Sequence, residues 1–310
     1  MTNPSKSTVI PAEPMTSWKH YLLPHTLTDA LRAMDAAGGR ARPIAGGTDL
    51  LLDLQQGRHP PIDVLVDISQ VAEMNILELR SECAFIGAAV PLSRLVAAPM
   101  LHTHAQALIE ACGLIGGPQV RNVATLGGNV AHALPAADGT IALLALDAQV
   151  EVAAPQASRL VALSTLFAGA GRSTLQVGKE LIVGFHLPLI KTGQASAFLR
   201  VMRPQGVALP ILNVAAWIQR ADDRILDVRL AIGPGGPTPL KLSEAEQILR
   251  GQSFSAAILD EAVRAVQNQA HFRSSPGRAT ADYRRSLADE LTREVIQLAW
   301  ERAAVAPLSQ

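Results

Sequence analysis

The spacing of apolar residues changes along the chain, and each change marks a predicted element. After Thr26 the apolar positions recur with helical spacing, with Thr26 as the N-terminal cap and Gly38 as the stop. Short apolar runs typical of buried strands follow at residues 43–45 and 64–68. This alternation predicts a first α/β lobe over about residues 18–66.

A second lobe is predicted over about residues 67–187. Its apolar runs favour strands at residues 84–88, 149–153 and 181–187, and helices at residues 92–96, 104–111 and 141–146. Residues 188–194 form the natural boundary after it.

The last part of the chain has a different order of elements. Three consecutive strand-like runs, at residues 197–201, 211–218 and 225–232, precede helices that begin at Ser243, Ala256 and Thr280. We therefore expect a C-terminal domain over residues 195–310, in which a three-stranded antiparallel sheet is backed by helices, and an α+β class overall. Residues 1–17 are polar and show no periodicity, so we expect a flexible leader there.

Two loops far apart in the sequence each join paired glycines to a hydroxyl residue and a short polar residue. They are Ala45-Gly46-Gly47-Thr48-Asp49 and Thr125-Leu126-Gly127-Gly128-Asn129. Paired glycines let the backbone approach a ligand without a Cβ in the way, and their N–H groups can point at phosphate oxygens. Each loop alone is more typical of a plain turn. Together they predict a clamp for a long ligand, and a dinucleotide fits better than a mononucleotide.

Composition and charge restrict the class of partner. The chain has 310 residues, of which 48% are apolar and 4% aromatic, and Lys plus Arg equals Asp plus Glu at 27 each. A balanced charge offers no basic field for nucleic acid or anionic lipid. The sequence also lacks a run long enough to span a bilayer and a signal-peptide pattern, so we expect a cytoplasmic protein without a membrane span.

Candidate metal and redox residues are few. Cys83 and Cys112 are the two cysteines, which is too few for an iron–sulfur cluster, and both are interpreted as buried, reduced thiols. No metal ligand set is expected, since His102 and His104 point to different faces of a predicted helix. His132, after the second loop, is interpreted as a hydrogen-bonded loop histidine, with contact to a ligand as the alternative.

The residues around both loops resemble the FAD-binding subunit of molybdenum hydroxylases. This family includes the medium subunit of aerobic carbon monoxide dehydrogenase and the flavin domain of xanthine dehydrogenase. The resemblance is carried by residues 119–129, by Asp138 after them, and by residues 45–51. Similar stretches in the family's order are residues 21–31, residues 232–240 and Tyr283-Arg284-Arg285.

The resemblance implies a fold, a cofactor and partners. It implies a two-lobed FAD-binding domain of the vanillyl-alcohol-oxidase type over residues 18–187, followed by the family's C-terminal flavoprotein domain. FAD is expected to be bound non-covalently. Molybdopterin and 2Fe–2S clusters are expected only in partners, a molybdopterin-binding large subunit and a 2Fe–2S small subunit, in a heterotrimer or its dimer.

The expected cofactor contacts fall into the two loops and a few further positions. The first loop and its preceding strand contribute Pro43, Ile44, Ala45, Gly46, Gly47, Thr48, Asp49 and Leu50, and the second loop contributes Thr125, Leu126, Gly127, Gly128 and Asn129. The resemblance adds Asp138 at the adenosine portion, and Ile115, Leu181 or Ile182, and Arg200 near the flavin ring.

From the residues alone, several of these positions have a simpler interpretation. Asp138 precedes an apolar helix, as an ordinary N-cap does. Ile115 has the pattern of a core residue, and Arg200 that of a solvated charge on an edge strand. Both interpretations of Arg200 remain open at this point.

The function implied by the resemblance is electron transfer. Such a subunit collects electrons from the 2Fe–2S clusters of a partner and passes them through FAD to an external acceptor, and we expect no catalytic residue in this chain. A self-contained FAD-dependent oxidoreductase on the same fold is the first alternative. A subunit that binds FAD without exchanging electrons is the second.

Overall fold

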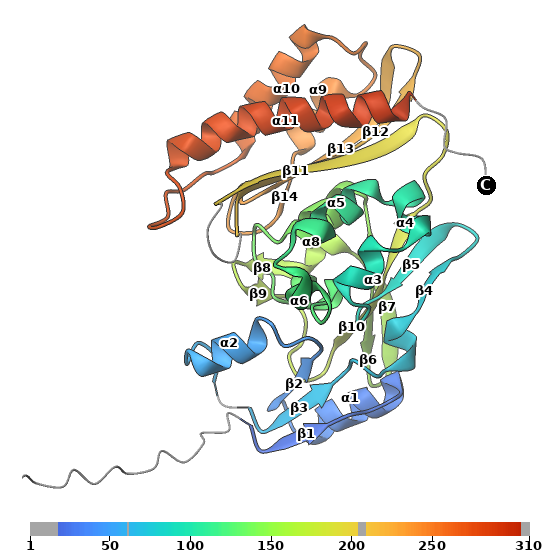
Figure 1. Ribbon diagram of the computed structural model, residues 1–310, viewed down its shortest axis with the longest axis vertical. Helices are drawn as coiled ribbons and strands as arrows, with labels where there is room; N and C mark the ends of the chain where they lie inside the picture. The colour runs from blue at the N-terminus through green and yellow to red at the C-terminus, as the bar shows by residue number, and fades with distance from the viewer. Residues whose placement is uncertain (1–17, 61, 204–208, 305–310) are drawn as a thin grey trace, which may run out of the picture.

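The fold is taken from a computed structural model, which describes residues 18–60, 62–203 and 209–304. The leader predicted for residues 1–17 lies outside this part of the chain. A small sheet lies at one end of the molecule, a larger sheet with short helices lies in the middle, and a third sheet under three helices lies at the other end (Figure 1). The mixed helix and strand content confirms the α+β class.

The first sheet is parallel and has the order β1-β3-β2. Its strands are β1 (His20–Leu22), β3 (Val64–Asp67) and β2 (Ala41–Ile44), and its helices are α1 (Leu27–Ala36) and α2 (Leu50–Gln55). The predicted cap of α1 is confirmed, because the Thr26 side chain accepts a hydrogen bond from the Asp29 N–H. The helix buries Ala30, Leu31 and Met34, the apolar face that the spacing predicts.

The second sheet is antiparallel and has five strands. In sheet order they are β4 (Leu77–Leu79), β5 (Cys83–Gly87), β10 (Leu181–Pro188), β6 (Gln149–Ala154) and β7 (Ala157–Ala162). A two-stranded ribbon is formed by β8 (Phe167–Gly169) and β9 (Arg172–Ser173), and single 3-10 turns by η1 (Ala72–Asn75) and η2 (Leu163–Leu166). One face of this sheet lies in the largest cluster of buried apolar residues, which is called the main core. Its members on this face include Val150, Val152 and Leu187.

Six helices accompany this sheet between β5 and β6. They are α3 (Leu92–Val96), α4 (Pro99–His104), α5 (Gln106–Leu114), α6 (Pro118–Arg121), α7 (Leu126–Ala131) and α8 (Asp138–Ala145). The single helix predicted over residues 104–111 is wrong at its start. The chain leaves the helical conformation at Ala105 (φ −146°, ψ 46°), which separates α4 from α5.

The third sheet is antiparallel and has four strands, so the prediction of three was wrong. Its strands are β11 (Gln194–Met202), β12 (Pro210–Ala221), β13 (Arg224–Gly233) and β14 (Leu240–Lys241). The fourth strand pairs only Lys241 with Ala231 and Leu240 with Ile232. Two residues are too short to show a period, which is why the apolar pattern did not reveal β14.

Helices cover one face of the third sheet, and the middle of the molecule covers the other. Helices α9 (Ser243–Leu249), α10 (Ala256–Gln269) and α11 (Ala281–Ala303) begin where the sequence predicts and share a core with β11 to β13. On the opposite face, Phe198, Ala215, Trp217 and Ala231 belong to the main core. Helices α5 and α8 therefore pack directly beneath β11 to β13 (Figure 1).

Glu110 of α5 joins the C-terminal sheet and helices to the middle of the molecule. Its carboxylate accepts hydrogen bonds from the Phe198 N–H at 2.9 Å and from the Arg302 guanidinium at 2.6 Å. Arg302 also donates to the Ser196 carbonyl oxygen at 2.9 Å. One carboxylate therefore satisfies donors from β11 and from α11 at once.

No helix among the described residues is long and apolar enough to cross a membrane.

We predict that Glu110→Ala lowers the free energy of unfolding by about 1–3 kcal/mol, because it leaves the Phe198 N–H and Arg302 without their acceptor. Glu110→Gln keeps a neutral acceptor and is expected to cost less. The measurement is urea unfolding followed by circular dichroism. Asp260→Ala is the matched control, since it removes an exposed ion pair with Arg293 and should cost less than about 1 kcal/mol. Equal effects of Glu110→Ala and Asp260→Ala would show that Glu110 does not join the two parts.

Candidate functional site

The two glycine-bearing loops lie against each other. A Cβ built on Gly46 would lie 2.1 Å from the Val123 carbonyl oxygen and 2.8 Å from the Ala124 backbone nitrogen. Such distances do not occur for real side chains, so the backbone of the first loop at Gly46 touches the backbone of Val123 and Ala124, immediately before the second loop. The prediction that both loops belong to one site is consistent with this contact. The absent Cβ at Gly46 makes room for this neighbouring segment.

The second loop is the start of a helix. Thr125 is the N-cap of α7, and its hydroxyl oxygen accepts a hydrogen bond from the Gly128 N–H at 3.1 Å. The Gly127 N–H donates to the Ala88 carbonyl oxygen at 3.0 Å, and a Cβ on Gly127 would lie 2.6 Å from that oxygen. Both N–H groups therefore have acceptors within the protein, and their expected contact with phosphate oxygens stays a prediction.

The first loop differs in this respect. Gly47 has φ +66°, a conformation that favours glycine, and the loop turns there from β2 into α2. Within the described part of the chain, the N–H groups of residues 46–50 have no hydrogen-bond acceptor. Thr48 and Asp49 are exposed. The first loop thus offers successive unpaired donors, the arrangement that binds phosphate oxygens.

His132 lies between two carboxylates of the first loop and its helix. Its Nδ1 is 3.6 Å from Asp49 Oδ1, and its Nε2 is 3.3 Å from Asp53 Oδ2. His132 is also the C-cap residue of α7. The interpretation as a loop histidine with protein partners agrees with this position, which ties the end of α7 to the start of α2.

Asn129 continues the second loop toward Asp138. Its side-chain oxygen accepts hydrogen bonds from the Thr140 N–H at 3.1 Å and from the Thr140 hydroxyl at 3.3 Å. Thr140 lies in the first turn of α8, so Asn129 satisfies a donor that the helix itself leaves free. Asn129 therefore holds the start of α8, with Asp138, beside the second loop.

Asp138 is the first residue of α8 and is buried, with 4% of its surface exposed. The N-cap is Ala137 and makes no side-chain hydrogen bond, so the interpretation of Asp138 as an ordinary cap is wrong. Its carboxylate accepts a hydrogen bond from the Asn213 amide at 2.6 Å and forms an ion pair with Arg200. Burial raises the pKa of Asp138, and Arg200 and Asn213 act against that rise.

Arg200 is not a solvated charge, since its side chain is 3% exposed. Besides Asp138, it donates to the Leu114 carbonyl oxygen. Leu114 immediately precedes Ile115, which is partly buried against the main core. The structure therefore brings Asp138, Arg200 and the backbone beside Ile115 together. Within the described residues, Arg200 Nε and Asn213 Oδ1 are buried without a hydrogen-bond partner, so this polar group has bonding capacity left.

Leu181 and Ile182 lie at the start of β10, paired with Ala153 and Val152 of β6. They are 2% and 5% exposed, which leaves little surface for a ligand. The next residue, Val183, accepts a hydrogen bond from the Ala88 N–H at 2.9 Å, and Ala88 bonds Gly127. Leu181 and Ile182 are thus connected to the second loop through Val183 and Ala88.

Asn213 is the functional candidate that the sequence analysis missed. It is fully buried on β12 and donates to the Ala136 carbonyl oxygen at 3.0 Å as well as to Asp138. Gly233 lies beside it, since a Cβ there would be 2.5 Å from the Pro135 carbonyl oxygen and 2.7 Å from Asn213 Oδ1. The available signal was an amide in the middle of an apolar strand run.

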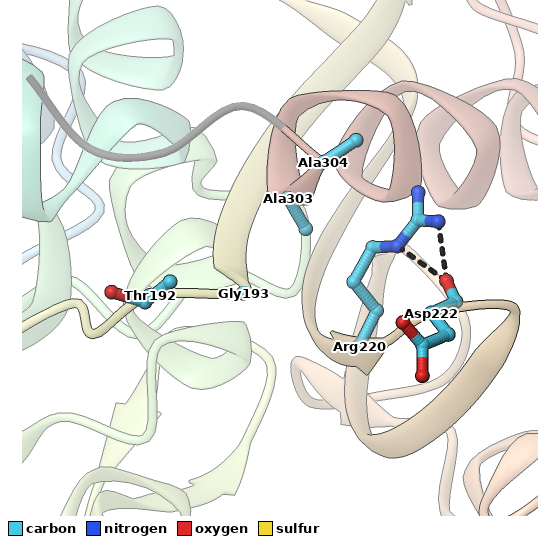
Figure 2. A pocket seen from close by; sticks show the side chains of 6 residues that line it. All are labelled: Thr192, Gly193, Arg220, Asp222, Ala303 and Ala304. Carbon is cyan, nitrogen blue, oxygen red and sulfur yellow. Dashed lines mark hydrogen bonds between the residues drawn. The ribbon is translucent and has the colours of Figure 1, made fainter.

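A shallow pocket elsewhere does not belong to this site. It is lined by Thr192, Gly193, Arg220, Asp222, Ala303 and Ala304 (Figure 2). Arg220 donates from Nε to the Asp222 carbonyl oxygen at 3.0 Å and lies over the Trp300 ring at 3.8 Å. The Arg220 guanidinium therefore already has partners within the protein.

Two known protein families match consecutive parts of the chain. Residues 14–190 match the family described as FAD binding domain in molybdopterin dehydrogenase, and residues 197–299 match the CO dehydrogenase flavoprotein C-terminal domain. The xanthine dehydrogenase FAD-binding subunit of Escherichia coli O157:H7 is 31% identical over 277 residues, which covers 87% of this chain and 92% of that protein.

Two further similarities concern carbon monoxide dehydrogenase of Hydrogenophaga pseudoflava. Its medium chain is 26% identical over 287 residues, which covers 92% of this chain and 98% of the relative. A solved structure of that enzyme, in a form lacking the Mo-pyranopterin moiety of the molybdenum cofactor, has a TM-score of 0.87 and 25% identity. The alignment covers 92% of this chain and 98% of that chain.

The fold and these matches define a flavin-carrying subunit of an oxidoreductase. Within that class, the chain belongs to the molybdopterin dehydrogenase FAD-binding family, which includes the FAD subunits of xanthine dehydrogenase and carbon monoxide dehydrogenase, and its cofactor is FAD.

We predict that Gly46→Ala lowers the free energy of unfolding by about 1–3 kcal/mol and reduces the flavin content, because the added methyl group separates the two loops. The measurements are urea unfolding and the flavin absorbance per chain. Gly113→Ala is the matched control, since no heavy atom lies within 4 Å of its Cβ position on α5. That control is expected to be neutral or to stabilise by less than about 1 kcal/mol. Wild-type stability and flavin content in Gly46→Ala would refute the contact between the loops.

Proposed function

We propose that this chain is the electron-transfer subunit of a molybdenum hydroxylase, which takes electrons from 2Fe–2S clusters of a partner subunit and passes them through FAD to an external acceptor. The observation that carries the proposal is the first loop, with its row of N–H groups without acceptors, held against the second loop at Gly46. These residues fit the diphosphate of a dinucleotide. The relatives named as FAD-binding subunit and medium chain support the role as one component of a larger enzyme.

The first loop is proposed to bind the pyrophosphate. The N–H groups of residues 46–50 donate to phosphate oxygens, and the exposed Thr48 hydroxyl adds another donor. Asp49 is an acceptor and suits a ribose hydroxyl better than a phosphate. The expected neighbouring contacts are Pro43, Ile44, Ala45, Gly47 and Leu50 on this side, and Thr125, Leu126, Gly127, Gly128 and Asn129 on the other.

The group around Asp138 is proposed to hold another part of the same cofactor. Asp138 accepts hydrogen bonds from the adenosine portion, as the family resemblance implies, and Arg200 supplies positive charge near the flavin ring. The unpartnered Arg200 Nε and Asn213 Oδ1 are the atoms available for further bonds. Ile115 and either Leu181 or Ile182 give the ring apolar surroundings. Bound FAD supplies the redox chemistry, and the protein tunes its potential and its access.

The division of the chain and its partners follow from the same proposal. Residues 18–187 are the FAD-binding domain, with lobes over about 18–66 and 67–187, of the vanillyl-alcohol-oxidase type, and residues 195–310 are the C-terminal domain. A molybdopterin-binding large subunit and a 2Fe–2S small subunit complete a heterotrimer or its dimer in the cytoplasm. The relatives' names contain different substrates, xanthine and carbon monoxide, so substrate choice is proposed to lie in a partner.

We predict that the purified chain carries FAD without a covalent bond. Acid precipitation should release all yellow colour into the supernatant, because the proposed contacts are hydrogen bonds that unfolding breaks. Chromatography of the supernatant identifies the flavin. Colour that stays with the precipitate would contradict non-covalent binding, and FMN in place of FAD would contradict a grip on a dinucleotide.

We predict further that the isolated chain does not oxidise substrates of this enzyme class. Under anaerobic conditions, aldehydes, purines and other N-heterocycles should leave its flavin absorbance unchanged. The correct substrate should bleach the flavin once the molybdenum and 2Fe–2S subunits are added. Turnover by the chain alone at about 1 per second or faster, the rate of complete enzymes, would favour the self-contained flavoenzyme instead.

A further inference from the structure

Cys83, His186 and Glu151 form a line of three side chains on the five-stranded sheet, outside the FAD site. They come from the three adjacent strands β5, β10 and β6. Cys83 Sγ lies 3.6 Å from His186 Nδ1, and His186 Nε2 lies 3.2 Å from Glu151 Oε2. His186 stands opposite Phe85 and Gln149 in the two ladders, so Cys83 and Glu151 are its diagonal neighbours on the same face.

This order of groups is that of a nucleophile, a base and a residue that orients the base. The Glu151 carboxylate can only accept a hydrogen bond, so it favours the tautomer with the proton on His186 Nε2. The lone pair of Nδ1 then points toward the Cys83 thiol and can take its proton. Cysteine is a nucleophile as the thiolate, and a neighbouring histidine is a recurring means of forming it.

All three residues are partly exposed. Cys83 is partly exposed, which corrects the expectation of two buried thiols, and the side chains of His186 and Glu151 are 21% and 31% exposed. The rings of Phe85 and His186 pack edge to face, with their centroids 5.0 Å apart. The other charged groups on this face are Arg80, over the Phe85 ring at 3.8 Å, and Glu78, which pairs with Arg80 at 2.9 Å.

Cys112 is a built-in control. It is fully buried on α5, as expected, and burial together with the nearby Asp138 raises the pKa of its thiol. The chain therefore contains one thiol with a base and access to solvent, and one thiol with neither.

We propose that Cys83 is a nucleophilic thiol, activated by His186, that reduces hydroperoxides and is thereby converted to the sulfenic acid. The Cys83 sulfur attacks one oxygen of the peroxide, an S–O bond forms, and the O–O bond breaks. Sulfur loses two electrons and the peroxide gains them. His186 takes the thiol proton and delivers it to the leaving hydroxide, so thiol and hydrogen peroxide give sulfenic acid and water.

The test uses the full-length, FAD-loaded chain treated with hydrogen peroxide, with the sulfenic acid trapped by dimedone and located by peptide mass. Adducts are expected at Cys83 and not at Cys112. Alkylation by iodoacetamide at pH 7 should be faster at Cys83, which lies beside His186, than at Cys112, which is buried. Absence of a dimedone adduct at Cys83 in the folded, peroxide-treated chain would overturn the proposal.

Two variants test the roles of His186 and Glu151 in the folded protein. His186→Gln should react about tenfold more slowly at pH 7, because a glutamine amide cannot take the proton of the Cys83 thiol. Glu151→Gln should cause a smaller loss, since an amide oxygen can still accept from Nε2. Flavin content and circular dichroism verify that each variant is folded. Equal rates in wild type and folded His186→Gln, or modification of Cys112 as fast as Cys83, would refute activation by His186.

Discussion

The contact between Gly46 and the Val123 carbonyl oxygen is the constraint on which the site depends. It joins the loop after β2 to the segment between α6 and α7, two parts of the chain that are far apart in sequence. From there the connections continue without a gap. Thr125 caps α7, Asn129 holds Thr140 of α8, and Asp138 bonds Arg200 and Asn213 of the third sheet. A side chain at residue 46 would overlap the Val123 backbone and separate the two segments at the start of this series.

The same series of contacts joins the C-terminal sheet to the proposed site. Asn213 and Arg200 come from β12 and β11, yet both turn toward the start of α8. Gly233 approaches the Pro135 carbonyl oxygen, so the third sheet also touches the chain between the second loop and α8. Residues of the third sheet thus contact the part of the chain that matches the family's FAD-binding domain.

Much of this architecture could be predicted from the sequence, and the exceptions have physical reasons. Thr26, Gly47 and the starts of α9 to α11 follow from capping and periodicity, which are local. The roles of Gly46 and Gly127 could not be predicted, since both depend on backbone that approaches from another part of the chain. Arg200 and Asp138 each looked ordinary, because a buried ion pair is visible only when both partners are placed. Cys83 lies close to His186 for the same reason, since register brings together residues that are distant in sequence.

Hydrogen–deuterium exchange of the backbone amides, with and without FAD, tests the proposed site most directly. The amides of residues 46–50 lack acceptors in the described protein and should exchange quickly without the cofactor. Bound FAD should slow them by about tenfold or more, because its phosphate oxygens become their acceptors. The amides of Gly127 and Gly128 already have acceptors and should change less. Protein with bound FAD whose amides at residues 46–50 exchange as fast as before would contradict the proposed site.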